Sequence, residues 1–145
     1  MTLVYPDTSF LLPLYLPDIH SPRAQSQLSG NQSLILTAFQ QAEFSNSVWQ
    51  QVFRRNLSLQ QAASVLDRFH EDTDDGVFLF ESQPNGWLEA STSVMRTLTP
   101  SLGLRTLDAL HIAAALALNL TDFWSFDHRQ RAAATAAGLA TNLVE

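Results

Sequence analysis

Short runs of strand-forming apolar residues alternate with segments of helical periodicity along the whole chain. The apolar runs, which are bounded by turn-forming or capping residues, predict strands over residues 2–5, 33–36, 77–80, 123–125 and 141–144. Between them, apolar positions recur every three or four residues and predict helices just after Asp7, over 21–30, from Thr37 to about 55, from Ser58 to about 75, over 87–98, over 107–118 and from Asp127 to Gly138. This alternation predicts a three-layer α/β domain with a largely parallel sheet.

Capping residues and a proline define several of the predicted helix boundaries. Asp127 is expected to form a capping box with Gln130. In such a box the side chain of each residue accepts a hydrogen bond from the backbone N–H of the other. Thr106 is expected to cap the helix over 107–118, which is the most apolar in the chain. Pro100, which follows a threonine, is expected to end the helix over 87–98.

Length and composition fit one soluble domain over residues 1–145, because 46% of the 145 residues are hydrophobic. The net charge of −6 argues against a surface that is broadly attractive to nucleic acid, so such a partner would have to be held locally. The chain has no lysine, which excludes P-loop and Schiff-base lysines. It has no cysteine either, which excludes disulfides and thiolate sites.

The beginning of the chain does not have the pattern of a targeting or membrane segment. No basic residue precedes Arg23, and the apolar stretch is interrupted by Pro6, Pro13 and Asp18. We therefore expect neither a signal peptide nor a membrane span, and we expect a cytoplasmic protein.

Four carboxylates follow predicted strands or begin predicted helices. Asp7 and Asp127 come directly after strands, Asp108 lies in the first turn of the apolar helix, and Glu43 lies in the second turn of the helix that Thr37 begins. The carboxyl ends of parallel strands meet at one edge of a sheet, where ligands bind. Each residue also has a purely structural interpretation, since Asp7 and Asp127 are good N-caps and Glu43 could be a solvated helix residue.

Asp108 is the carboxylate that a structural role explains least well. With His111 it forms the only polar stripe on the first two turns of a helix that is otherwise apolar. A buried carboxylate needs compensation, and a helix N-terminus supplies only about 0.3–1 kcal/mol. A divalent cation such as Mg²⁺ or Mn²⁺, held by several carboxylates, would supply the rest, because these ions prefer hard oxygen ligands.

Three arginines lie close to these acids in the sequence. Arg105 precedes the helix of Asp108, and Arg129 and Arg131 lie in the first turns of the last predicted helix, where the helix dipole disfavours cations. They are candidates for contacts with a phosphate backbone. The alternative is that they offset neighbouring acids or are solvated.

Four segments in this order resemble the PIN-domain ribonucleases, and within them the VapC-type toxins of toxin–antitoxin pairs. The most specific segments are residues 5–9 (YPDTS), 42–44 (AEF), 106–113 (TLDALHIA) and 124–127 (WSFD), the last followed by an alanine-rich helix and Gly138-Leu139. The resemblance covers nearly the whole chain and is consistent with the predicted α/β fold.

The resemblance implies a metal-dependent endoribonuclease. Asp7, Glu43, Asp108 and Asp127 would form its acidic site and hold one or two Mg²⁺ or Mn²⁺ ions, which would lower the pKa of a bound water and stabilise charge on the scissile phosphate. Thr8 and Ser125 match positions that support this site by hydrogen bonds. An RNA substrate, a cognate antitoxin and a homodimer are the implied partners.

Other functions remain open at this stage. The chain could be a catalytically silent PIN-like module that binds a partner, with its acids serving as caps, or it could be a metal-dependent DNA nuclease or phosphatase. The acidic balance and the absence of lysine suggest either a selective, structured RNA substrate or a groove that a second subunit completes.

Overall fold

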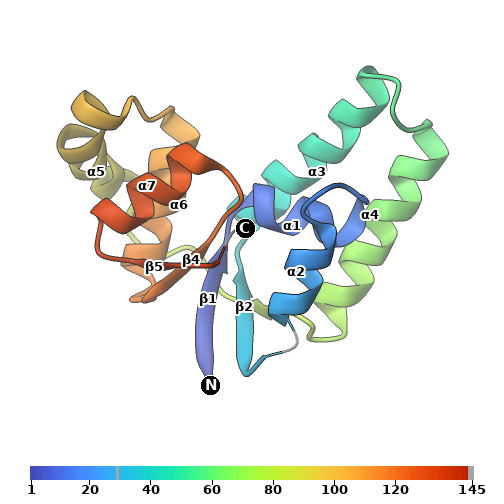
Figure 1. Ribbon diagram of the computed structural model, residues 1–145, viewed down its shortest axis with the longest axis horizontal. Helices are drawn as coiled ribbons and strands as arrows, with labels where there is room; N and C mark the ends of the chain where they lie inside the picture. The colour runs from blue at the N-terminus through green and yellow to red at the C-terminus, as the bar shows by residue number, and fades with distance from the viewer. Residues whose placement is uncertain (29, 144–145) are drawn as a thin grey trace.

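Five parallel strands form the centre of the protein (Figure 1). The computed structural model describes residues 1–28 and 30–143. The strands, given in sequence order, are β1 (Thr2–Pro6), β2 (Gln32–Leu36), β3 (Leu79–Phe80), β4 (Asp122–Trp124) and β5 (Ala140–Thr141). In the sheet they lie in the order β3-β2-β1-β4-β5, and every neighbouring pair is parallel. The predicted α/β class and the parallel sheet are therefore confirmed.

Helices cover both faces of this sheet (Figure 1). The described helices are α1 (Thr8–Tyr15), α2 (Ser21–Leu28), α3 (Ala38–Phe53), α4 (Leu59–Asp74), α5 (Trp87–Leu102), α6 (Thr106–Ala117) and α7 (His128–Ala136). The first four pack on one side of the strands, and α5, α6 and α7 pack on the other. Within the described residues, no helix combines the length and the hydropathy that a bilayer crossing requires.

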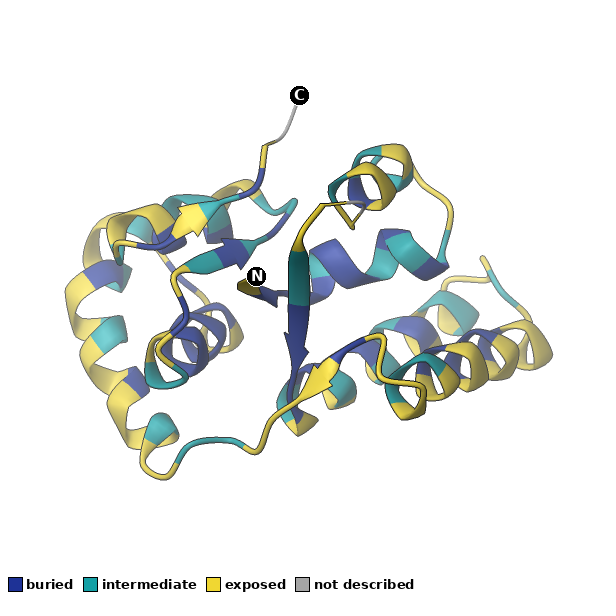
Figure 2. Ribbon diagram, turned by 90° about the horizontal axis from the view of Figure 1, so that it is seen from below, coloured by how far each residue is buried: buried dark blue, intermediate teal, exposed yellow. Residues whose placement is uncertain are grey.

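Successive residues of the central strands belong to different halves of the core. In β1, Val4 packs with the α1–α4 side, whereas Tyr5 packs with the α5–α7 side. In β2, Leu36 and Ile35 divide in the same way, because neighbouring side chains of a strand point to opposite faces of the sheet. Figure 2 shows these strands as the buried centre, with exposed residues on the outer faces of the helices.

Several of the predicted boundaries are confirmed. Thr37 and Ser58 each cap their helix through a capping box, and Asp127 caps α7 by accepting from the backbone N–H of Gln130. The other half of the box predicted at Asp127 does not form, because the Asp127 N–H donates to the Ser125 hydroxyl and the Gln130 amide donates to the Asp108 carbonyl. Gly138, with φ +88°, follows the end of α7 as expected.

Two predicted helix boundaries are wrong. The N-cap of α6 is Arg105 rather than Thr106, because the Asp108 carboxylate accepts from the Arg105 backbone N–H at 3.2 Å and closes the first turn one residue earlier. Pro100 does not end α5, which continues to Leu102 and stops at Gly103, where φ is +63°. In the last turn Pro100 removes only one intrahelical hydrogen bond, which the chain tolerates.

The two outer strands are shorter than predicted. In the expected strand over 77–80, only Leu79 and Phe80 pair with β2, and Val77 lies outside the pairing. The expected strand over 141–144 is observed as β5, which starts at Ala140 and ends at Thr141, while residue 144 lies outside the described residues. Strands at the edge of a sheet have one neighbour, so less of each run is fixed by pairing.

Candidate functional site

A cavity of about 720 Å³ opens at the carboxyl edge of the sheet, and all four carboxylates line it. They are Asp7, Glu43, Asp108 and Asp127, and each comes from a different segment of the chain. The parallel strands explain the convergence, since β1 and β4 pair up to Pro6 and Trp124 and so end side by side. Folding thus brings together acids that are far apart in the sequence.

Asp7 directly follows β1 and caps α1, and the residue is almost fully buried. It accepts hydrogen bonds from the hydroxyls of Ser9 and Ser125, both at 2.6 Å, and from the backbone N–H of Phe10 at 3.1 Å. Burial raises the pKa of Asp7 to about 6, although His111 and these donors oppose the rise. An ionised Asp7 is therefore costly unless a cation lies close to it.

The two serine hydroxyls also tie β4 to this site. Ser125 is fully buried, and its hydroxyl accepts from the backbone N–H of Asp127 at 3.0 Å. The hydroxyl of Ser9 accepts from the backbone N–H of Phe126 at 2.9 Å. Ser125 was expected to support the site from the resemblance, whereas the role of Ser9, in the first turn of α1, emerges only from these hydrogen bonds.

Glu43 projects from α3 and is held from two sides. Its Oε1 accepts from the Thr8 hydroxyl and lies 2.7 Å from His111 Nε2. The other ring nitrogen of His111, Nδ1, lies 2.8 Å from the Tyr5 hydroxyl. Burial alone would raise the pKa of Glu43, but the hydrogen bond and charge of His111, together with the Thr8 hydroxyl, outweigh it and lower the pKa. His111 was expected only to share a polar stripe with Asp108, and its contacts with Glu43 and Tyr5 join residues too far apart in the sequence to be predicted.

Asp108 and Asp127 share one arginine. Arg105 Nε lies 3.0 Å from Asp108 Oδ2, and its Nη2 lies 3.7 Å from Asp127 Oδ2. The compensation that the buried Asp108 requires thus comes from a guanidinium group in this structure. The Arg105 side chain is 68% exposed, and ion pairs of exposed side chains contribute at most about 1 kcal/mol. A competing cation or anion can therefore displace it at low cost.

The other two candidate arginines do not line the cavity. Arg131 Nη1 donates to Asn142 Oδ1 at 2.8 Å and to the Ser125 carbonyl at 3.2 Å, so it links the residue after β4 to the residue after β5. Arg129 Nη1 reaches the Gly103 carbonyl at 3.5 Å. Of the three arginines singled out from the sequence, only Arg105 belongs to the cavity wall.

The donor chemistry of this cavity fits a hard divalent cation. Within residues 1–28 and 30–143, no group of three or more His, Asp or Glu side chains forms a ready-made metal cage. Two of the carboxylates nevertheless suit a cation, because the contacts of Glu43 with Thr8 and His111 both end on Oε1, and burial disfavours the charge of Asp7. Oxygen ligands of this kind suit Mg²⁺ and Mn²⁺.

Comparison with solved structures reveals the same architecture in several proteins. VapC20 of Mycobacterium tuberculosis, described as a sarcin-ricin loop cleaving toxin, is similar with a TM-score of 0.68 at 15% identity over 94% of this chain and 96% of that chain. VapBC2 of Rickettsia felis, crystallised with a promoter DNA fragment, gives a TM-score of 0.65 at 14% identity over 99% of this chain and 100% of that one.

A third similar structure is FitAcB of Neisseria gonorrhoeae, with a TM-score of 0.61 at 17% identity over 97% of this chain and 96% of that chain. No curated protein matches the chain by sequence. The family model described as PIN domain matches residues 4–136, a span that includes all four carboxylates. The resemblance inferred from the sequence is thereby confirmed, and the chain belongs to the PIN-domain family.

Proposed function

We propose that this protein is a divalent-metal-dependent endoribonuclease that acts as the toxin of a toxin–antitoxin pair. The observation that carries the proposal is the convergence of Asp7, Glu43, Asp108 and Asp127 on one cavity. Membership of the PIN family supports it, as do similar structures that are described as a toxin or as toxin–antitoxin complexes. An RNA substrate, a small antitoxin and a homodimeric state belong to this proposal, and such a toxin would act on RNA in the cytoplasm.

The four carboxylates would hold Mg²⁺ or Mn²⁺ beside the scissile phosphate. When bound, the ion supplies an activated nucleophile at neutral pH and stabilises the charge that develops on the phosphate. Ser9 and Ser125 fix the orientation of Asp7 by donating to both of its oxygens. Because a bound cation would supply the nucleophile, no cysteine or lysine would be required, and the chain has neither.

Glu43 would be oriented from behind in the same way. Thr8 and His111 both direct their donors at Oε1, which leaves Oε2 for the cation. Tyr5 fixes the ring of His111 from the core side. Hydrogen bonds to the ligands of a metal set their geometry, and losing one typically costs a factor of 10 to 100 in metal affinity or activity. Thr8 and His111, which contact Glu43 directly, are therefore positioning residues, whereas Tyr5 contacts only His111.

The proposal is tested by titrating Mn²⁺ calorimetrically into the wild-type protein and into Asp108→Asn, and by assaying both on RNA, on DNA and on a phosphomonoester. We expect metal-dependent cleavage of RNA by the wild type, and loss of both metal binding and cleavage in Asp108→Asn. Asp67→Asn, which removes an exposed carboxylate from α4 outside the cavity, is the matched control. Absence of cleavage by the wild type would favour a silent binding module, and cleavage of DNA or of the monoester alone would change the substrate class.

A further inference from the structure

One face of α3 forms a wall of the cavity from the carboxylates to the end of the helix. Glu43, Ser47, Gln50 and Arg54 are spaced by three or four residues, which places them on one side of a helix, and all four line the cavity. Residue 54 follows residue 43 by eleven positions, which corresponds to about 16 Å along the axis. The acidic site is therefore continuous with the C-terminal tip of α3.

Arg54 differs from the other arginine of the cavity. Arg105 is held by Asp108 and Asp127, whereas neither Arg54 nor its neighbour Arg55 forms an ion pair with any residue that the structure describes. Both side chains are exposed. A protein with a net charge of −6 thus presents two adjacent cations without ion pairs, with Arg54 in the wall of its acidic cavity and Arg55 next to it in the sequence.

Arg55 also has an unfavourable backbone conformation. Its φ is +62°, in the left-handed region, where a side chain with a Cβ costs energy. At the other described positions with positive φ, the chain uses Gly76, Gly86, Gly103, Gly138 or Asn119. Glycine would end α3 at lower cost, so the requirements of the turn do not explain an arginine at this position.

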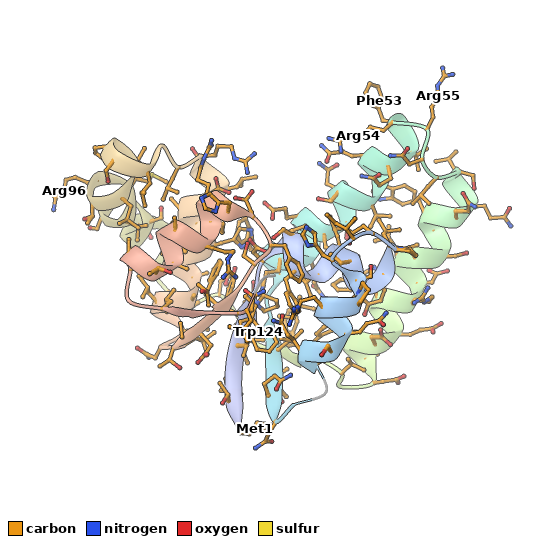
Figure 3. All side chains as sticks on the ribbon, viewed as in Figure 1. Met1, Phe53, Arg54, Arg55, Arg96 and Trp124 are labelled. Atoms are coloured by element: carbon orange, nitrogen blue, oxygen red, sulfur yellow. The ribbon has the colours of Figure 1, made fainter. Side chains whose placement is uncertain are left out.

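Phe53 completes the tip. Its side chain is 89% exposed, so it contributes almost nothing to either half of the core. Figure 3 shows Phe53, Arg54 and Arg55 projecting together from the end of α3. Arginines for the backbone and an exposed aromatic ring for a base are the combination with which proteins bind unpaired nucleic acid strands.

We propose that the tip of α3, formed by Phe53, Arg54 and Arg55, binds an unpaired stretch of the RNA substrate about 16 Å from the carboxylates that cleave it. Arg54 and Arg55 contact phosphates, Phe53 stacks on a base, and the polar face of α3 guides the strand to the carboxylates. The proposal rests on the proposed function for the identity of the polymer. Two adjacent cations that form no ion pair favour a polyanion as the molecule bound at the tip. A second copy of this chain that bound through its own tip would place arginines against arginines, which repel each other.

The test measures binding of a fluorescently labelled single-stranded RNA by anisotropy, with the full-length protein in EDTA so that nothing is cleaved. Arg54→Gln and Arg55→Gly are each expected to raise Kd roughly three- to tenfold and to lower the salt dependence of binding by about one ion. Arg55→Gly should also raise Tm, because glycine relieves the left-handed strain. The matched control is Arg96→Gln, which replaces an exposed arginine of α5 at the far end of the molecule (Figure 3). It should change neither the Kd nor the salt dependence of RNA binding.

Phe53→Ser tests the stacking contact. It should weaken binding of the single strand but not of an RNA duplex of equal length, in which the bases are already stacked on one another. Sedimentation of the same variant tests the alternative occupant of the tip. A shift from dimer to monomer with unchanged RNA affinity would identify the tip as a subunit interface and overturn the proposal.

The outcomes separate this inference from the nuclease function. If the wild type cleaves RNA and the arginine variants bind and cleave as well as it does, the inference fails and the nuclease function stands. If the wild type cleaves no RNA but the arginine variants bind it more weakly, the tip is an RNA-binding surface and the nuclease function fails. Failure of the wild type to bind any RNA would overturn the inference.

Discussion

The imidazole of His111 joins the core to the acidic cavity, with Nε2 at 2.7 Å from Glu43 Oε1 and Nδ1 at 2.8 Å from the Tyr5 hydroxyl. His111 is 2% exposed, so its contact with Tyr5 is buried, whereas the Glu43 side chain on its other side is partly exposed. A buried donor and a buried acceptor thereby satisfy each other, and the carboxylate is held toward the cavity.

Replacing His111 with Ala should therefore affect both stability and the site. The Tyr5 hydroxyl would be left buried without its partner, which costs about 1–3 kcal/mol, and the cavity left by the ring would add to this loss. Urea unfolding measures the change. Tyr5→Phe is the control, because it removes only the hydroxyl and should leave Mn²⁺ affinity close to that of the wild type. We expect His111→Ala to weaken Mn²⁺ binding. If Tyr5→Phe weakened it as much, His111 would not act by positioning Glu43.

Asp7→Asn should stabilise the metal-free protein at neutral pH. Burial raises the pKa of Asp7 from 3.8 to about 6, so the folded state binds the proton more tightly than the unfolded state. Stability from this group is fully present below about pH 4 and is lost as the pH rises through 6. At pH 7.5 the variant should exceed the wild type by up to about 3 kcal/mol, and the difference should vanish below pH 4. The measurement is Tm against pH in EDTA, and a variant that is less stable at every pH would show that Asp7 is held by its hydrogen bonds rather than strained by its charge.

Divalent metal should raise Tm, because a ligand that binds only the folded state stabilises it by about 2.7 kcal/mol at one hundred times its Kd. Asp108→Asn should abolish this rise while changing the stability of the metal-free protein little, since an asparagine oxygen can still accept from the Arg105 backbone N–H. Thermal unfolding with and without Mn²⁺ measures both. A large loss of stability in EDTA would instead assign Asp108 a structural role.

Arg105→Gln should tighten Mn²⁺ binding. The guanidinium group competes with a cation for the carboxylates of Asp108 and Asp127, and its own ion pairs are exposed enough to contribute less than about 1 kcal/mol to folding. Calorimetric titration of both proteins measures the change in Kd, with Arg96→Gln as the control for loss of one positive charge. Weaker binding in Arg105→Gln would mean that the guanidinium group organises the carboxylates rather than competes for them.

Local sequence signals predicted the order of the elements and several helix boundaries correctly. Thr37, Ser58 and Asp127 cap helices as expected because a cap is satisfied by backbone groups within three residues. The parallel sheet and the PIN family also followed from sequence patterns. The prediction that Pro100 ends α5 is wrong because the cost of a proline depends on its distance from the helix end, which Gly103 sets three residues later.

The hydrogen-bonding partners of the site residues could not be derived in the same way. Glu43 and His111 are 68 positions apart, and Ser125 and Asp7 are 118 apart, so their contacts depend on how the layers pack. The direction of an arginine depends on packing as well, which is why Arg131 points into the fold although its position in the helix suggested a phosphate contact. Residue types and their order thus determined which elements form and which acids end at one edge of the sheet. The partner of each charge, and the uncompensated arginines at the tip of α3, were decided by tertiary packing, because those distances exist only after the chain has folded.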